Sequence, residues 1–92
     1  MDKEHIKDII LNTFIDYLHL DKDYFLRFSD DGNNLFIVKD LGCDPLTRFE
    51  ILEKIEKKCG ILISDEDVIW GNDLTIYQYI NSIYNNIKNE RL

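Results

Sequence analysis

The sequence predicts an all-α domain with three main helices and one short helix, and three observations support that class. Apolar residues recur at steps of three and four in three segments of roughly fifteen residues. Two of these segments begin at residues typical of a helix N-terminus. A chain of 92 residues, 45% of them hydrophobic and 32% charged, suits one folded domain over residues 1–92 with a single modest core.

The first predicted helix spans residues 4–18. Its apolar side chains fall on one broad face at about 100° per residue, with charged and amide side chains opposite. The residues expected on the inner face are Ile6, Ile9, Ile10, Thr13, Phe14, Tyr17 and Leu18. The connection that follows, residues 20–43, combines aromatic clusters with a turn-forming run at 29–34. It therefore predicts either an irregular loop or a short hairpin.

The second predicted helix, residues 45–59, has the clearest boundaries. Asp44 is a favoured N-cap residue, and Pro45 at the first helical position has its φ already set and loses no hydrogen bond. Gly60 suits the residue that ends the helix. The residues expected on its inner face are Leu46, Phe49, Leu52, Ile55 and Cys59.

Two more helices are predicted in the last third of the chain. The short one begins after Ser64, which can cap it, and ends near Trp70. The last helix begins at Thr75, which forms a capping box with Gln78, flanked by a hydrophobic staple between Leu74 and Tyr79. The residues expected on its inner face are Ile76, Ile80, Ile83, Tyr84 and Ile87.

The net charge of −7 excludes several classes of partner. It repels phosphate backbones and anionic lipid headgroups, so binding to nucleic acid is not expected. No apolar run is long enough to span a bilayer, and the first five residues lack the basic-then-apolar layout of a signal peptide. We therefore expect a cytoplasmic monomer that does not insert into membranes.

The cysteines and histidines offer little chemistry. Two cysteines are too few for a disulfide framework, and neither has the spacing of a metal site. Cys43 precedes a helix N-terminus, which favours a thiolate, so it is either a redox or acyl-accepting residue or a small residue packed in the loop. Cys59 is expected in the core, and His5 and His19 are expected to be exposed. Because no histidine is suitably spaced from a cysteine, we expect no catalytic residue and no enzyme activity.

Residues 40–46, with the sequence D-L-G-C-D-P-L, resemble the modification-site segment D-L-G-x-D-S-L of acyl carrier proteins. Residues 50–52, 63–66 and 74–76 continue the resemblance, which covers about residues 37–88. It implies an acyl-carrier-like four-helix bundle in which the connection between the first two helices is longer than usual.

The residue that departs from this family is Pro45. In acyl carrier proteins the serine at this position receives a 4′-phosphopantetheine arm through a phosphodiester. Pro45 has no hydroxyl group, so the arm cannot be attached there. Thr47 is a poor substitute because two residues along a helix rotate the side chain by about 200°. The resemblance therefore implies a carrier-like chain without its prosthetic group, and no other cofactor or metal is expected.

The resemblance also implies a docking face for a protein partner, such as a synthase or another enzyme of a lipid pathway. Matching of positions places on it Asp44, Leu46, Thr47, Glu50, Glu53, Glu56, Lys57 and Ile63. The family's helix is acidic, whereas residues 46–59 hold four bases and three acids. Electrostatic steering should therefore be weakened or redirected. The alternative is that this mixed-charge face is simply solvated.

Three functions follow from these features. The leading hypothesis is a non-catalytic protein-interaction or regulatory module related to the carriers of fatty-acid and polyketide synthesis. A second is a non-covalent binder of acyl chains, against which the bulk of Phe49 and Ile55 argues because cores pack densely. A third is an acidic inhibitor of a basic toxin, like an immunity protein, which the composition favours and residues 40–46 do not.

Overall fold

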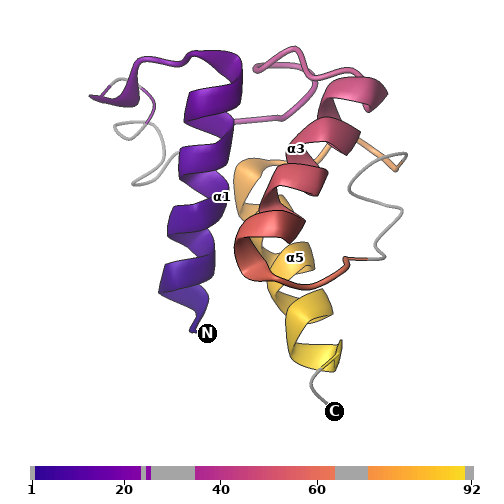
Figure 1. The fold of residues 1–92 in the computed structure, drawn as a ribbon. Coiled ribbons are helices and arrows are strands. Elements are labelled where there is room, and N and C mark those ends of the chain that lie inside the picture. The colour runs from indigo at the N-terminus through magenta and orange to yellow at the C-terminus, as the bar shows by residue number, and fades with distance from the viewer. Residues whose placement is uncertain (1, 24, 26–34, 64–70, 91–92) are drawn as a thin grey trace.

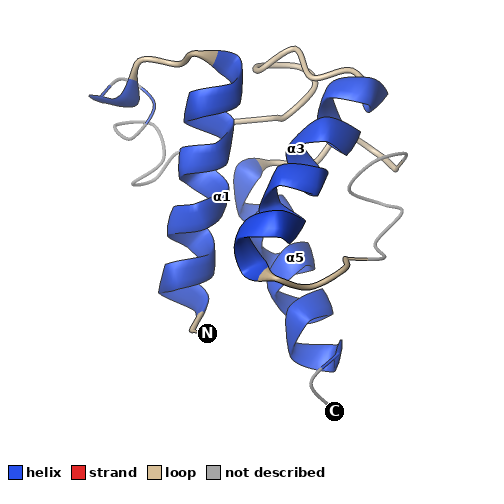
Figure 2. Ribbon diagram, viewed as in Figure 1, coloured by secondary structure: helices blue, strands red, loops and turns tan. Residues whose placement is uncertain are grey.

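The computed structural model describes residues 2–23, 25, 35–63 and 71–90. Its long helices are α1 (Lys3–Leu18), α3 (Pro45–Cys59) and α5 (Ile76–Glu90), and α1 packs against both of the others (Figure 1). Residues 22, 23 and 25 of the connection after α1 are also helical, so the described part of the chain is all-α, as predicted (Figure 2). The short helix predicted over 64–70 lies outside the described residues. Residues 24 and 26–34 of the connection, which include the turn-forming run at 29–34, also lie outside them, so the predicted hairpin is not tested there.

Helix α1 has the predicted extent. The Asp2 carboxylate accepts a hydrogen bond from the His5 amide at 2.9 Å, and His19 ends the helix in the left-handed conformation, with φ 55°. The buried residues of α1 are Ile6, Ile10, Leu11, Thr13, Phe14 and Ile15. The buried face is shifted from the prediction: Leu11 and Ile15 belong to it, whereas Ile9, Tyr17 and Leu18 are only half-buried. The reason is that α1 contacts two other helices and is covered on two sides.

Helix α3 begins and ends where the sequence predicts. The Asp44 carboxylate accepts a hydrogen bond from the Thr47 amide at 2.8 Å, Pro45 is the first helical residue, and Gly60 ends the helix with φ 72°. Glycine has no Cβ and adopts this left-handed φ at no steric cost, so it suits the residue that ends the helix.

The predicted inner face of α3 is wrong at its N-terminal end. Leu46 is 66% exposed and Phe49 is 43% exposed, whereas Arg48, Ile51, Leu52 and Ile55 are buried. Each step of three residues rotates the side chain by about 300°, so three such steps from Leu46 end on the opposite side of the helix. The core face is therefore centred on Ile51, Leu52 and Ile55. Of the two bulky residues expected to fill the core, Ile55 is buried and Phe49 is not.

Helix α5 begins at the predicted capping box. The Thr75 amide donates to the Gln78 side chain at 3.0 Å, and the Gln78 amide donates to the Thr75 hydroxyl at 3.2 Å. The predicted inner isoleucines are all buried, and Tyr84 is half-buried. Tyr79 is also fully buried, with its ring edge-on to that of Phe14 at 5.2 Å between centroids. This contact joins α5 to α1 in the centre of the core.

The segment before α3 is fastened to the segment before α5. The Ile37 amide donates to the Leu74 carbonyl and the Ile76 amide donates to the Leu35 carbonyl, each at 2.9 Å. The Asp73 carboxylate accepts hydrogen bonds from two further amides, those of residues 38 and 39, at 2.8 and 3.0 Å. These bonds fix the start of α3 relative to the start of α5. Within the described ranges, therefore, the connection pairs with the segment before α5 through an isolated bridge between residues 36 and 75.

None of the helices that the structure describes is both long enough and apolar enough to cross a bilayer.

Candidate functional site

The segment that resembles the carrier modification site forms a tight turn leading into α3. The Asp40 carboxylate accepts a hydrogen bond from the Phe36 amide at 2.7 Å, and Gly42 has a φ of 70° that favours glycine. The Cys43 amide then donates to the Ile37 carbonyl at 3.1 Å. These contacts hold the backbone so that the chain enters α3 at Pro45, whose side chain is exposed to solvent.

The site at residue 45 is therefore accessible but chemically inert. The pyrrolidine ring offers neither a hydroxyl nor a backbone N–H, and its fixed φ suits the first position of the helix. The Thr47 amide is already engaged as the donor to the Asp44 cap. The role that this turn performs in the structure is to start α3.

Four of the residues predicted for the docking face share the side of α3 that faces away from the core. At about 100° per residue, Leu46, Glu50, Glu53 and Lys57 fall within roughly 60° of one another. We call these four residues the α3 face. Glu50 is half-buried and the other three are exposed. Phe49 borders the α3 face, although its spacing had predicted a core position.

The other predicted docking residues have different roles. Asp44 caps the helix and Thr47 lies on its flank, half-buried. The Glu56 carboxylate accepts a hydrogen bond from the Ile63 amide at 2.7 Å and so ties down the chain after the helix. Ile63 is only 6% exposed and belongs to the core. The α3 face is therefore narrower than the matched positions imply.

Cys43 does not have the activated thiol that its position suggests. Its side chain is 0% exposed, and burial raises the pKa of the thiol to about 11, although the nearby Arg48 guanidinium lowers it. Burial removes water from the thiolate and so raises its free energy. This effect on the pKa is larger than the opposite effects of Arg48 and of the helix N-terminus. The structure supports the other predicted role, in which Cys43 is a small residue packed beneath the loop. Cys59 is half-buried, and burial raises its pKa as well.

We expect Cys43 to resist alkylation in the folded chain. In a Cys59→Ala variant, which leaves it as the single cysteine, iodoacetamide at pH 8 should react at least ~100-fold more slowly than in denaturant. A raised pKa of about 11 leaves little thiolate at pH 8, and burial excludes the reagent. Intact-mass measurements over time give both rates. Equal rates would show that Cys43 is an accessible, activated nucleophile.

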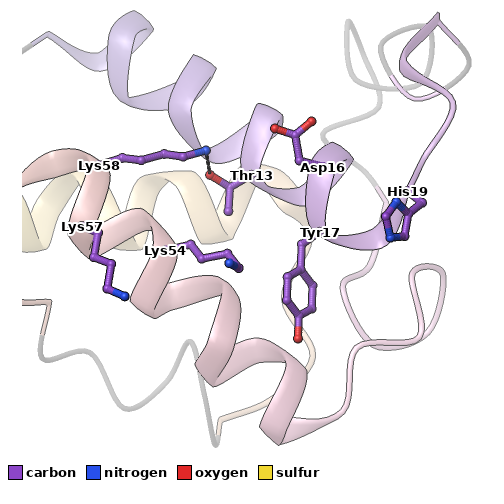
Figure 3. Close-up of a pocket in the computed structure, with 7 residues that line it drawn as sticks. All are labelled: Thr13, Asp16, Tyr17, His19, Lys54, Lys57 and Lys58. Atoms are coloured by element: carbon purple, nitrogen blue, oxygen red, sulfur yellow. Dashed lines mark hydrogen bonds between the residues drawn. The ribbon is translucent and has the colours of Figure 1, made fainter.

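A surface hollow between α1 and α3 was not predicted from the sequence. Its volume is about 530 Å³, and we call it the lysine hollow (Figure 3). It is lined by Thr13, Asp16, Tyr17, His19, Lys54, Lys57 and Lys58. Spacing could have indicated each wall, since Thr13 and Tyr17 are four residues apart, as are Lys54 and Lys58. Their meeting depends on the packing of α1 against α3, which no local pattern shows.

Two histidines and one buried arginine complete the candidate residues in the part of the chain that the structure describes. His5 and His19 are both exposed, as predicted. Among the residues described, no group of three or more His, Cys, Asp or Glu side chains could hold a metal ion. Arg48 is an unexpected buried residue at 4% exposure, and it lies close enough to Cys43 to affect its pKa.

The resemblance to acyl carrier proteins is carried by residues 40–46, 50–52, 63–66 and 74–76 of this sequence. Comparisons of the chain with models of protein families, with curated proteins and with solved structures found no match.

Proposed function

We propose that this chain is an acyl-carrier-like module that has lost its prosthetic group and acts by binding a protein partner. The observation that carries the proposal is the placement of Pro45. It lies exposed at the first position of α3, at the end of a carrier-type segment, where that family presents the serine it modifies. A chain that retains this turn but lacks the hydroxyl keeps the surface around the modification site and cannot carry the phosphopantetheine arm.

Two exposed apolar side chains favour docking over a merely solvated helix. Leu46 and Phe49 are three residues apart, so they are neighbours on the surface of α3. A single exposed apolar residue needs no explanation, but an adjacent leucine and phenylalanine provide the apolar centre that interfaces use. Covering them would remove apolar area from water at about 25 cal/mol per Å².

The charges beside this pair indicate what the partner's surface must offer. Two acidic residues, Glu50 and Glu53, and then one basic residue, Lys57, follow Leu46 along the α3 face, so it carries charges of both signs. A uniformly basic patch would meet Lys57 unfavourably. We infer a partner with an apolar pocket flanked by charges of both signs. Such a partner would bind this module in preference to carriers whose docking helix is uniformly acidic.

Affinity capture from the native host tests this proposal. We expect the immobilised chain to recover a synthase or another lipid-pathway enzyme, and a Leu46→Ala/Phe49→Ala variant to recover at least tenfold less of it. Truncation of two central apolar contacts commonly costs more than the roughly 1.4 kcal/mol that tenfold represents. Tyr77→Ala is the matched control, because Tyr77 is an exposed aromatic residue of α5.

Two outcomes would contradict the proposal. Undiminished recovery by the double variant would place the partner elsewhere on the chain. Recovery of a basic toxin instead of a lipid-pathway enzyme would favour the acidic-inhibitor alternative, which the net charge of −7 allows.

A further inference from the structure

We propose that the lysine hollow binds a small anion that carries a phosphate or carboxylate group next to an apolar or aromatic group. The hollow lies between α1 and the C-terminal half of α3. This inference does not rest on the proposed function: Lys54 and Lys58, which would hold the anion, lie outside the α3 face, whereas Lys57 belongs to both the hollow and that face.

The local charge of the hollow is opposite to that of the chain. Three lysines and one carboxylate line it, giving +2 with His19 neutral, whereas the whole chain has a net charge of −7. The one carboxylate among the lining residues, that of Asp16 on α1, only partly offsets the charge of the lysines. A concave site with an excess of one sign concentrates ligands of the other sign.

One lysine is held in place by a buried hydroxyl. The Lys58 ammonium donates a hydrogen bond to the Thr13 hydroxyl at 3.1 Å, and this hydroxyl itself donates to the Ile9 carbonyl (Figure 3). Thr13 is buried, so its position is fixed by the core of α1. An ammonium group has three N–H donors, and this contact uses one of them. The others can meet an anion at the Thr13 end of the hollow, with less ordering cost because Lys58 is already placed.

A second lysine stands over an aromatic wall. The Lys54 ammonium lies 5.7 Å from the centroid of the Tyr17 ring, within the range of a cation–π contact. Tyr17 is half-buried and faces the hollow with its ring. An anionic group beside Lys54 would therefore bring its attached apolar or aromatic part against Tyr17. The volume of about 530 Å³ is in the range of small-molecule pockets, roughly 300–1,000 Å³.

Acidic residues limit where the anion can lie. A smaller adjoining hollow, about 300 Å³, shares Tyr17, Lys54 and Lys57 but is also lined by Glu50 and Glu53. These carboxylates repel an anion from that side. The phosphate or carboxylate should therefore sit between Lys54 and Lys58, near Thr13.

Amide spectra of the ¹⁵N-labelled chain titrated with phenyl phosphate test the proposal. We expect saturable shifts at Thr13, Tyr17 and Lys58, and no saturable shifts with phenol. Benzoate tests whether a carboxylate can replace the phosphate, and inorganic phosphate tests binding without the aromatic ring. Saturable binding of either supports the site. Lys54→Gln and Lys58→Gln should each weaken phenyl phosphate binding about tenfold, the loss expected for one charge-assisted hydrogen bond.

Lys88→Gln is the matched control, since it removes one exposed positive charge from α5 outside the hollow. It should leave the dissociation constant unchanged, and Lys54→Arg should retain most of the binding. Shifts that never saturate, or equal weakening by all three glutamine variants, would overturn the proposal. The amide spectrum of Lys58→Gln shows whether loss of the bond to Thr13 disturbs the fold. If it does, the comparison of Lys54→Gln with Lys54→Arg decides the result.

Discussion

Replacing Phe14 with alanine should lower the free energy of unfolding by about 3–5 kcal/mol, the usual loss for a buried phenylalanine. Phe14 is 1% exposed, and its ring meets Tyr79 at an interplanar angle of 83°. The substitution removes buried apolar area, leaves a cavity and deletes an edge-to-face contact worth about 0.5–1.5 kcal/mol on its own. For a chain of this size the total stability is of order 5–14 kcal/mol. Urea unfolding followed by circular dichroism measures the change.

Phe49→Ala is the matched control for this prediction. Phe49 is the phenylalanine that the spacing in α3 assigns to the core and the structure leaves 43% exposed. Its truncation should cost less than about 1 kcal/mol, since an exposed side chain leaves no closed cavity. Equal losses in the two variants would show that Phe49 is buried and that the core face of α3 is misplaced.

Changing Pro45 to serine should restore modification by phosphopantetheine. The substitution creates D-L-G-C-D-S-L at the start of α3 and presents a hydroxyl at an exposed helical position. Serine at the first helical position leaves the Asp44 cap intact, so α3 should form as before. After incubation with coenzyme A and a promiscuous phosphopantetheinyl transferase, we expect intact mass to show one added arm per chain.

The control for this gain is Thr47→Ser. It supplies a serine two residues later, rotated by about 200° around the helix, so no arm should be added. Failure of Pro45→Ser to accept the arm, alongside a standard carrier that accepts it, would contradict the carrier resemblance. Modification of both variants would show that position along α3 does not matter.

The helix boundaries could be predicted because local chemistry sets them. Asp44, Pro45 and Gly60 each satisfy a requirement of a helix end within one or two residues, and the same holds for the capping box of Thr75 and Gln78. No distant contact is needed to interpret these signals. The observed ends therefore match the predicted ones.

The inner face of α3 could not be fixed in the same way. Apolar residues cover most of its circumference in the first two turns, so the spacing is compatible with several faces. The choice is made by tertiary packing, which buries Arg48 and Ile51 and leaves Leu46 exposed. Burial of the long Arg48 side chain has no signal in an apolar pattern.

The candidate sites also differ in whether local sequence or tertiary packing determines them. Residues 40–46 are contiguous, so the turn and its exposed proline could be located from the sequence. The sequence left two roles open for Cys43, because the helix N-terminus is visible in the sequence and the depth of burial is not; the structure supports the packed residue. The lysine hollow joins Thr13 to Lys58 across 45 residues of chain, a contact that only the tertiary structure provides.

The most direct test of the account is the intact mass of the unaltered chain. It would be measured after purification from the native host and again after incubation with coenzyme A and the transferase. We predict the mass of the bare polypeptide in both samples, because Pro45 has no atom that can accept the arm. An added phosphopantetheine group in either sample would show that the chain is a working carrier and would contradict the central claim.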